Sequence, residues 1–262
     1  MGSPQQRTRR QPARLKLRLC RWREIGRGGS LTLCSQQAQS ALAKAAAAFD
    51  PISKFADLAK YSNGGLECSL ETVSGDAITP AFVDALTALM AEEERPVGGK
   101  GALTEAPTSF LVAKAGESMV GFAGYHTGAA EVPVLIADWI YVGTEVRRKG
   151  LGSHLVTILE KTATATELKG VQAGVPEAWP STHDSLKFLW KLDWSMNPVQ
   201  PTGKSPVQIV SHILDPEAME VLKAAAEQQR INETAAKNTG PKKGPDAPVG
   251  QGFQGMTSAT TQ

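Results

Sequence analysis

A basic segment that contains two glycines, Val142–Gly152, has the residue types and spacing that best fit a chemical task. It reads V-G-T-E-V-R-R-K-G-L-G and joins an apolar stretch to an amphipathic one. The first backbone N–H groups of a helix have no intrahelical partner, and the helix dipole adds positive potential there. Because Gly150 and Gly152 lack a Cβ, a phosphate can approach this backbone closely. The segment therefore predicts a pyrophosphate cradle. Three basic residues add charge to it: Arg147, Arg148 and Lys149.

Two common phosphate-binding patterns do not describe this segment. A P-loop has the pattern GxxxxGK[ST], which the sequence lacks. A dinucleotide-binding GxGxxG would need a third glycine three residues after Gly152, where the chain has Leu155. The cradle is therefore expected to serve another kind of phosphate ligand.

A single carboxylate, Asp138, interrupts the apolar stretch Val134–Val142. A carboxylate in an otherwise apolar strand is a candidate general base or amine-binding group. The structural alternative is that Asp138 lies at a β-bulge or pairs with a lysine. His126, at the end of the preceding predicted strand, is the second candidate for proton transfer. We expect His154 at the surface and His212 packed in the last strand.

The order Arg147-x-x-Gly150-x-Gly152, after an apolar strand that ends at Val142, resembles the Arg/Gln-x-x-Gly-x-Gly/Ala signature of the GNAT superfamily of N-acetyltransferases. The resemblance extends over about Leu66–Leu214. It implies an α+β fold with a mixed α/β sheet, in a single domain with flexible extensions at both ends. It also implies acetyl-CoA as co-substrate, without a metal. The coenzyme-binding residues that it implies are Ile140, Tyr141, Val142, Arg147, Arg148, Lys149, Gly150, Leu151, Gly152, Ser153 and Thr182.

A second segment, Thr182–Trp194, resembles a later helix of the same family, with the pattern N-x-x-A-x-x-φ-Y-x-K-φ-G-F. The matching positions are Thr182, Ser185, Phe188, Lys191, Leu192 and Trp194. Asp193 replaces the usual glycine. Leu189 stands where many members carry the tyrosine that protonates the departing thiolate, and His183 is a weak substitute for that acid.

The chemistry implied by the resemblance is direct attack of a primary amine on the thioester in a ternary complex. A base must deprotonate the amine, and Asp138 is the leading candidate, followed by His126. A backbone N–H near Ile140–Val142 is expected to polarise the carbonyl. Because Leu189 replaces the tyrosine, a non-catalytic acyl-CoA-binding or interaction module is the alternative.

The acceptor is left open between a small amine, a peptide N-terminus and a lysine side chain. In the family it is selected by segments that correspond here to Thr79–Thr108 and Met196–Val207. The run Glu92–Glu94 could attract a cationic amine or form a solvated helix end. A homodimer is compatible with the sequence, whereas a membrane or nucleic-acid partner is disfavoured.

Period-two and helical patterns predict the elements that position these residues. They are a strand at Leu66–Val73, a helix after Thr79-Pro80, strands at Ser109–Lys114, Met119–His126 and Val134–Val142, a helix from Gly150, a strand at Val171–Val175, a helix at Thr182–Lys191, a strand at Val207–Leu214 and a helix from Pro216 to about Asn238. We therefore place the acetyltransferase domain at residues 63–214. A helical extension at 36–62 precedes it, and a helix at 215–238 and a disordered tail at 239–262 follow it.

The ends of the chain differ in composition from its middle. Residues 1–27 hold nine basic side chains and one acid, and this charge of +8 leaves −6 on the rest of a chain whose total is +2. Residues 1–35 therefore predict a basic arm: a disordered extension or one created by a wrongly chosen start codon, a transit peptide, or, least favoured, a nucleic-acid-binding arm. We expect a cytoplasmic protein, or as the alternative a plastid or mitochondrial one. The three cysteines form no CxxC pair, so a zinc site or disulfide framework is disfavoured.

Overall fold

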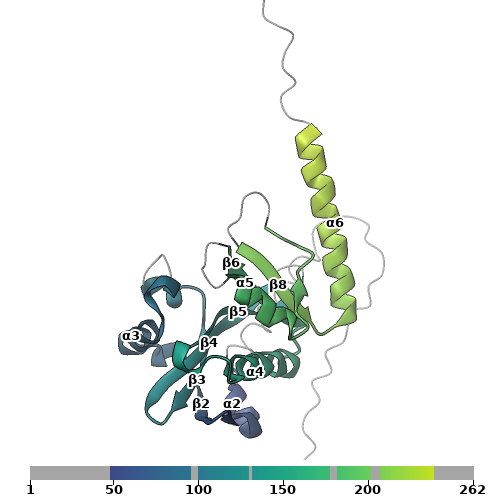
Figure 1. The fold of residues 1–262 in the computed structure, drawn as a ribbon. Coiled ribbons are helices and arrows are strands. Elements are labelled where there is room, and N and C mark those ends of the chain that lie inside the picture. Colours follow the sequence, from purple (N-terminus) through teal and green to yellow (C-terminus); the bar gives the residue numbers. More distant parts are fainter. Residues whose placement is uncertain (1–47, 96–99, 130–131, 178–181, 202–206, 239–262) are drawn as a thin grey trace, which may run out of the picture.

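A mixed sheet of eight strands runs through the molecule (Figure 1). The computed structural model describes residues 48–95, 100–129, 132–177, 182–201 and 207–238. Its strands are β1 (Lys60–Asn63), β2 (Leu66–Ser74), β3 (Ser109–Ala115), β4 (Ser118–Ala129), β5 (Pro133–Val142), β6 (Gly170–Pro176), β7 (Ser195–Met196) and β8 (Val207–Ile213). They lie in the order β1-β2-β3-β4-β5-β6-β8-β7, and only β5 and β6 are parallel neighbours. The predicted arm at 1–35 and tail at 239–262 lie outside the described residues.

The α-helices of the described residues are α2 (Pro51–Lys54), α3 (Pro80–Leu89), α4 (Leu151–Ala165), α5 (Thr182–Trp190) and α6 (Pro216–Asn238). Helix α3 begins as predicted, because the Thr79 hydroxyl accepts a hydrogen bond from the Phe82 N–H at 3.3 Å and Pro80 occupies the first turn. Helix α6 extends beyond the sheet (Figure 1). Its N-terminal part packs Ala218 and Leu222 against Val134 of β5.

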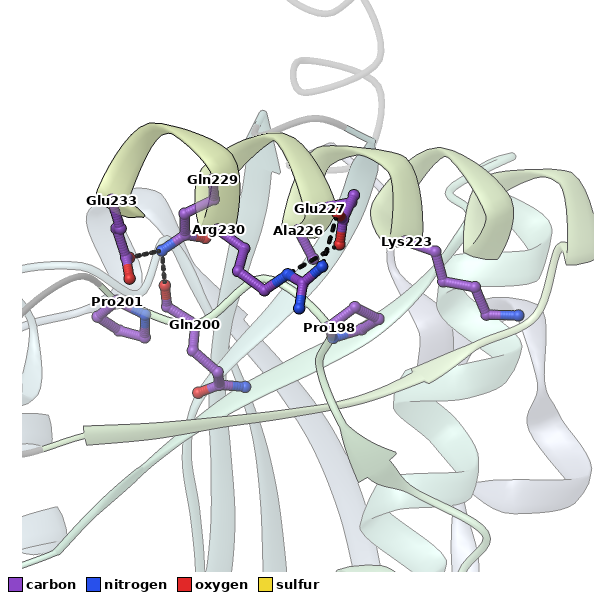
Figure 2. Close-up of a pocket in the computed structure, with 9 residues that line it drawn as sticks. All are labelled: Pro198, Gln200, Pro201, Lys223, Ala226, Glu227, Gln229, Arg230 and Glu233. Atoms are coloured by element: carbon purple, nitrogen blue, oxygen red, sulfur yellow. Dashed lines mark hydrogen bonds and ion pairs between the residues drawn. The ribbon is translucent and has the colours of Figure 1, made fainter. Parts of the chain in front are cut away.

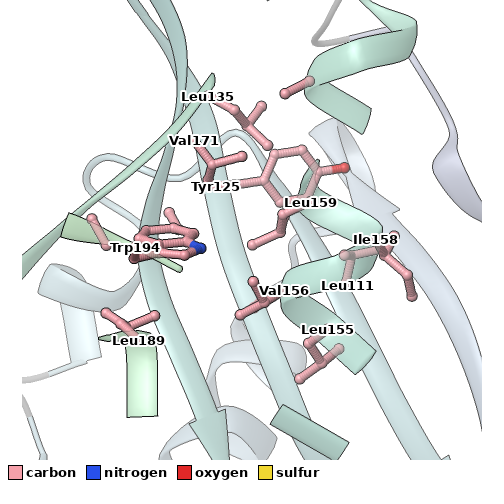
Figure 3. Close-up of a cluster of buried hydrophobic side chains, with 14 of the residues drawn as sticks. Leu111, Tyr125, Leu135, Leu155, Val156, Ile158, Leu159, Val171, Leu189 and Trp194 are labelled. Atoms are coloured by element: carbon pink, nitrogen blue, oxygen red, sulfur yellow. The ribbon is translucent and has the colours of Figure 1, made fainter. Parts of the chain in front are cut away.

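The alternation of strand residues separates two hydrophobic clusters on opposite faces of the sheet. In β3, Leu111 and Ala113 join the cluster beneath α4 and α5, whereas Phe110 and Val112 join the cluster beneath α3. Figure 3 shows how α4 inserts its apolar side chains into the first cluster. Those side chains are Leu155, Val156, Ile158 and Leu159. The predicted α+β fold with a mixed sheet is confirmed, and α4 is packed firmly behind the loop that precedes it.

One part of the predicted N-terminal extension is wrong, because β1 is a strand and not the end of a helix. It pairs antiparallel with β2, with Asn63 opposite Leu66. The turn residues Gly64 and Gly65 have φ of 58° and 73°, which glycine adopts without steric cost. The Asn-Gly-Gly sequence is a hairpin signal, and the domain boundary expected at residue 63 falls inside this hairpin. The short strand β7 was also missed, since two residues carry no periodicity.

Candidate functional site

Strands β5 and β6 pair over only part of their length. Their register joins Leu135 to Val171 and Ala137 to Ala173, and among the described residues no pair follows. Beyond that point β5 continues to Val142 along β4. The edge of β5 that faces β6 therefore keeps backbone N–H and C=O groups outside the ladder, and such groups are available to a ligand.

A cleft of ≈ 680 Å³ opens at this end of β5. Its walls are the end of β5, the loop before α4, the first turn of α4, and one side of α5. The lining residues are Glu94, Ile140, Tyr141, Val142, Val146, Arg147, Arg148, Gly150, Leu151, Gly152, Ser153, Asp184, Ser185, Lys187, Phe188 and Lys191. The structure thus brings together nine of the eleven coenzyme-binding residues predicted from the sequence. Lys149 lies between two lining residues, and Thr182 instead donates its hydroxyl to the carbonyl of Pro176.

The loop needs glycine at position 150, and Gly152 leaves room for Phe188. Gly150 has φ of 87°, and a Cβ there would meet the Tyr61 hydroxyl. A Cβ at Gly152 would lie 3.2 Å from Cζ of Phe188, across the cleft. No side chain caps the N-terminus of α4. The first turn of α4 therefore offers backbone donors and positive potential to an anion in the cleft.

Arg147 is held on one side of the cleft by a buried partner. Its guanidinium donates to Oε2 of Glu94 at 2.6 Å and to the carbonyl of Val142 at 2.9 Å. It also lies over the ring of Tyr141, 5.4 Å from the centroid. Its charge is therefore partly neutralised, and we expect the backbone of the loop to contribute more to anion binding than this side chain.

For Glu94, one of the two interpretations of Glu92–Glu94, a solvated helix end, is wrong. It is 7% exposed and also accepts a hydrogen bond from the Tyr141 hydroxyl at 2.9 Å. Burial alone would raise the pKa of Glu94, but the hydrogen bonds from Arg147 and Tyr141 outweigh it and lower that pKa below its ordinary value of 4.5. Glu94 therefore stays ionised and fixes Arg147.

Glu94→Gln is expected to lower the free energy of unfolding by about 1–2 kcal/mol at neutral pH, because a charge-assisted bond becomes a neutral one. A group whose folded pKa is depressed stabilises the protein above its unfolded pKa and loses that effect as pH falls through the folded value. The difference between wild type and variant should therefore shrink once the pH falls below 4.5. Urea unfolding over a pH series measures it, with the exposed neighbour in Glu93→Gln as control. A difference that persists unchanged at low pH would contradict the assignment.

Asp138 and His126 face each other across β5 and β4. Nδ1 of His126 lies 2.7 Å from Oδ2 of Asp138, and the two side chains are 26% and 14% exposed. The register shifts here, since Gly124 pairs with Trp139 and Tyr125 with Ala137. Asp138 thus lies at a β-bulge, which re-aims its side chain.

The pair lies on the side of the sheet away from α4. Tyr125 belongs to the cluster beneath α4, so the next residue, His126, points to the opposite face. Neither His126 nor Asp138 lines the cleft, but Ile140 does, roughly 7 Å further along the strand. An amine that approaches the end of the cleft from this face would meet the pair first.

The side of α5 that faces the cleft carries Phe188 and not Leu189. Leu189 is 3% exposed and packs in the core with Trp194 (Figure 3). In the register that the sequence resemblance implies, the family's tyrosine position is therefore occupied by a buried leucine. Lys187 and Lys191 also line the cleft, and Lys187 is not among the site residues expected from the sequence. Their spacing of four residues places both on one helix face, which was the available signal.

The remaining histidines have other neighbours. His154 was expected at the surface, but it is half-buried: its Nε2 lies 2.9 Å from the Leu58 carbonyl oxygen, and its ring centroid lies 4.8 Å from that of Tyr61. His212 packs through Nδ1 against Glu160 at 2.8 Å. His183 is exposed and does not line the cleft.

A second hollow of ≈ 550 Å³ lies between α6 and residues 198–201 (Figure 2). Its polar groups are largely engaged with one another. Arg230 pairs with Glu227 at 2.8 Å, and Gln229 donates to the Gln200 carbonyl at 2.9 Å. The cleft at α4 has the uncapped helix start that this hollow lacks, so it is the better candidate for the functional site.

Neither a metal cluster nor a bilayer-spanning helix occurs in the part of the chain that the structure describes. No three or more His, Cys, Asp or Glu side chains there are grouped so that they could hold an ion. No helix there is both long and apolar enough to cross a membrane.

Residues 77–189 match the sequence model of the acetyltransferase (GNAT) family. No protein of curated function matches the chain in sequence. Among solved structures, a candidate GNAT-family acetyltransferase from Desulfovibrio desulfuricans is similar at a TM-score of 0.45 and 14% identity, over 56% of this chain and 99% of that one. Naa50 of Arabidopsis thaliana, in complex with the bisubstrate analogue CoA-Ac-MVNAL, is similar at a TM-score of 0.40 and 14% identity, over 55% of this chain and 97% of that one. An aminoglycoside 6'-N-acetyltransferase complexed with coenzyme A is similar at a TM-score of 0.41 and 17% identity, over 55% of this chain and 97% of that one. Since the matched residues include β5, the loop and α4, the chain carries a domain of the GNAT acetyltransferase family.

Proposed function

We propose that this domain transfers the acetyl group of acetyl-CoA to a primary amine. The observation that carries the proposal is the cleft at the unpaired end of β5, where an uncapped helix start meets Gly150 and Gly152. Backbone N–H groups of Arg148–Gly152 would bind the pyrophosphate. Lys187 and Lys191, on the opposite wall, add positive charge for the same anionic donor.

The acyl end of the donor would lie between β5 and β6. There the backbone of Ile140–Val142 lies beyond the last β5–β6 pair, and although the Val142 carbonyl accepts from Arg147, an N–H that points into the wedge can polarise the thioester carbonyl. Holding donor and acceptor in one cleft supplies a large part of the rate enhancement, because a bimolecular step becomes effectively unimolecular.

The His126–Asp138 pair is the candidate base for the acceptor amine. The amine nitrogen forms a bond to the carbonyl carbon, the C–S bond breaks, and the sulfur leaves with its electron pair. The proton released by the nitrogen goes to the pair, and the thiolate takes a proton from water, since α5 places Leu189 and not an acid at the family's tyrosine position. Asp138 orients the imidazole of His126 through the 2.7 Å contact.

The acceptor class is proposed more broadly, as a primary amine on a small molecule, a peptide N-terminus or a lysine. Solved structures of similar proteins include one bound to a peptide-linked coenzyme analogue and one that acts on aminoglycosides. We infer that acceptors approach on the α3 side of the sheet, because the His126–Asp138 pair faces away from α4.

Coenzyme A is expected to bind the wild-type protein with a Kd of about 1 µM–1 mM, within the range typical of enzyme substrates. Isothermal titration calorimetry measures it. Release of free thiol from acetyl-CoA, over a panel of small amines, peptides and lysine substrates, measures turnover. Absence of binding at millimolar coenzyme A would remove the enzyme proposal. Binding without thiol release for any amine would favour the second candidate, a non-catalytic acyl-CoA-binding module, which the burial of Leu189 favours.

A further inference from the structure

The loop that precedes α4 is held, on the side away from the cleft, by the β1–β2 hairpin. The Tyr61 hydroxyl donates to the carbonyl of Lys149, and Nδ2 of Asn63 donates to the same oxygen at 3.2 Å. The turn of the hairpin packs on the same residue, because a Cβ at Gly64 would lie 3.6 Å from Cγ of Lys149. Two side chains of β1 thus converge on one loop carbonyl.

The Lys149 carbonyl controls the direction of a backbone N–H group in the cleft. A trans peptide bond points its C=O and N–H groups in opposite directions. With the Lys149 oxygen drawn toward β1, the N–H of Gly150 must point away from β1. Gly150 lines the cleft, so this N–H is aimed at the ligand side of the loop.

The loop conformation needs such support. Arg148 has φ of 65° and Gly150 has φ of 87°, so two left-handed residues flank the held carbonyl. A left-handed residue other than glycine is strained and persists where its surroundings hold it. The hydrogen bonds to the Lys149 oxygen, on the peptide between these two residues, are placed to do so.

The hairpin is itself tied to the first turns of α4. His154 lies against the ring of Tyr61, with 4.8 Å between the centroids, and its Nε2 donates to the Leu58 carbonyl at 2.9 Å. Tyr61 is therefore fixed on one side by α4 and on the other by the loop. Residues 60–63 lie outside the region that matches the family, 77–189. These contacts of Tyr61 and Asn63 with the Lys149 carbonyl, called the brace below, thus involve residues outside the family match.

We propose that Tyr61 and Asn63 are positioning residues that pre-organise the loop for a pyrophosphate-containing acyl donor. The proposal rests on the proposed function, since it needs the cleft to hold that pyrophosphate. It assigns to β1 a role in coenzyme affinity without contact to the coenzyme.

Tyr61→Phe is expected to weaken coenzyme A binding about 3–10-fold, because it removes one neutral hydrogen bond and keeps the ring against His154. The kcat/KM for S-acetylpantetheine, which has no pyrophosphate, should stay within twofold of wild type, since only the pyrophosphate would contact the loop. Calorimetry gives the first value and thiol release the second. Asn63→Ala, on an exposed side chain, should show the same split to a smaller extent.

The matched control is Tyr125→Phe, which removes a buried tyrosine hydroxyl from the core beneath α4 and should leave coenzyme A affinity unchanged. Unchanged coenzyme A affinity in both Tyr61→Phe and Asn63→Ala, with wild type binding normally, overturns the brace alone. An equal loss for S-acetylpantetheine also overturns it, because it would indicate general damage. Failure of wild type to bind coenzyme A overturns the proposed function and, with it, the brace.

Discussion

Asp138→Asn is expected to lower kcat by about 10²–10⁴-fold, the usual contribution of an acid–base group, and to leave coenzyme A affinity nearly unchanged. Asparagine keeps the shape of the side chain and can still accept a hydrogen bond from His126, which lies 2.7 Å away. It cannot accept the proton of the acceptor amine. Because Asp138 does not line the cleft, donor binding should be spared. Steady-state thiol release and calorimetry on the same variant measure the two quantities.

Asp57→Asn is the control for this substitution, since Asp57 has a 74% exposed side chain, 3.9 Å from Lys161, far along the chain from β5. It should keep wild-type kcat. Full activity of Asp138→Asn at neutral pH with a good acceptor would show that the carboxylate is not needed for proton removal, and His126 alone or a water chain would be next to test. A loss confined to coenzyme affinity would instead show that β5 presents Asp138 to the donor.

Gly150→Glu is expected to weaken coenzyme A binding by at least about 100-fold, because it combines backbone strain with charge repulsion, each of about 1–3 kcal/mol. The Cβ would collide with the Tyr61 hydroxyl, at a residue with φ of 87°. The added carboxylate would then repel the pyrophosphate at the start of α4, where negative charge is otherwise favoured. Calorimetry measures the loss, and circular dichroism checks that the fold is kept.

The same substitution at Gly116 is the matched control. Gly116 has φ of 59° but no atom within 4 Å of an added Cβ. Gly116→Glu therefore adds the same charge and a similar backbone cost of about 1 kcal/mol without touching the cleft. It should bind coenzyme A as wild type does. Near-normal binding by Gly150→Glu would show that the pyrophosphate lies away from this loop.

The local signals in the sequence were enough to predict the loop and six of the eight strands, all but β1 and β7. Strand β5, the glycines and the amphipathic face of α4 are consecutive in the chain, so their periodicity and spacing predicted the elements and their order correctly. The replacement of the family's tyrosine by Leu189 was also visible, and burial of Leu189 in the core accounts for it physically. Thr182 shows the limit of such matching, since its hydroxyl binds the chain itself at Pro176.

Contacts between distant residues were decided only by the tertiary structure. Glu94 and Arg147 are far apart in the sequence, and their 2.6 Å contact depends on how the segment after α3 packs beside the loop. The sequence named Asp138 and His126 separately. A β-bulge, which shifts the register between β4 and β5, brings their side chains together.

The sequence by itself thus determined which loop combines backbone donors, glycines and a helix start, the features on which the proposed pyrophosphate site depends, because all of them lie within a few residues. Only the tertiary structure decided how the loop is held and where the base candidate faces. Tyr61 reaches Lys149 because β1 pairs with β2 and turns back at Gly64. No local pattern encodes that approach, since hydrogen bonds between separate segments depend on the packed arrangement of the whole sheet.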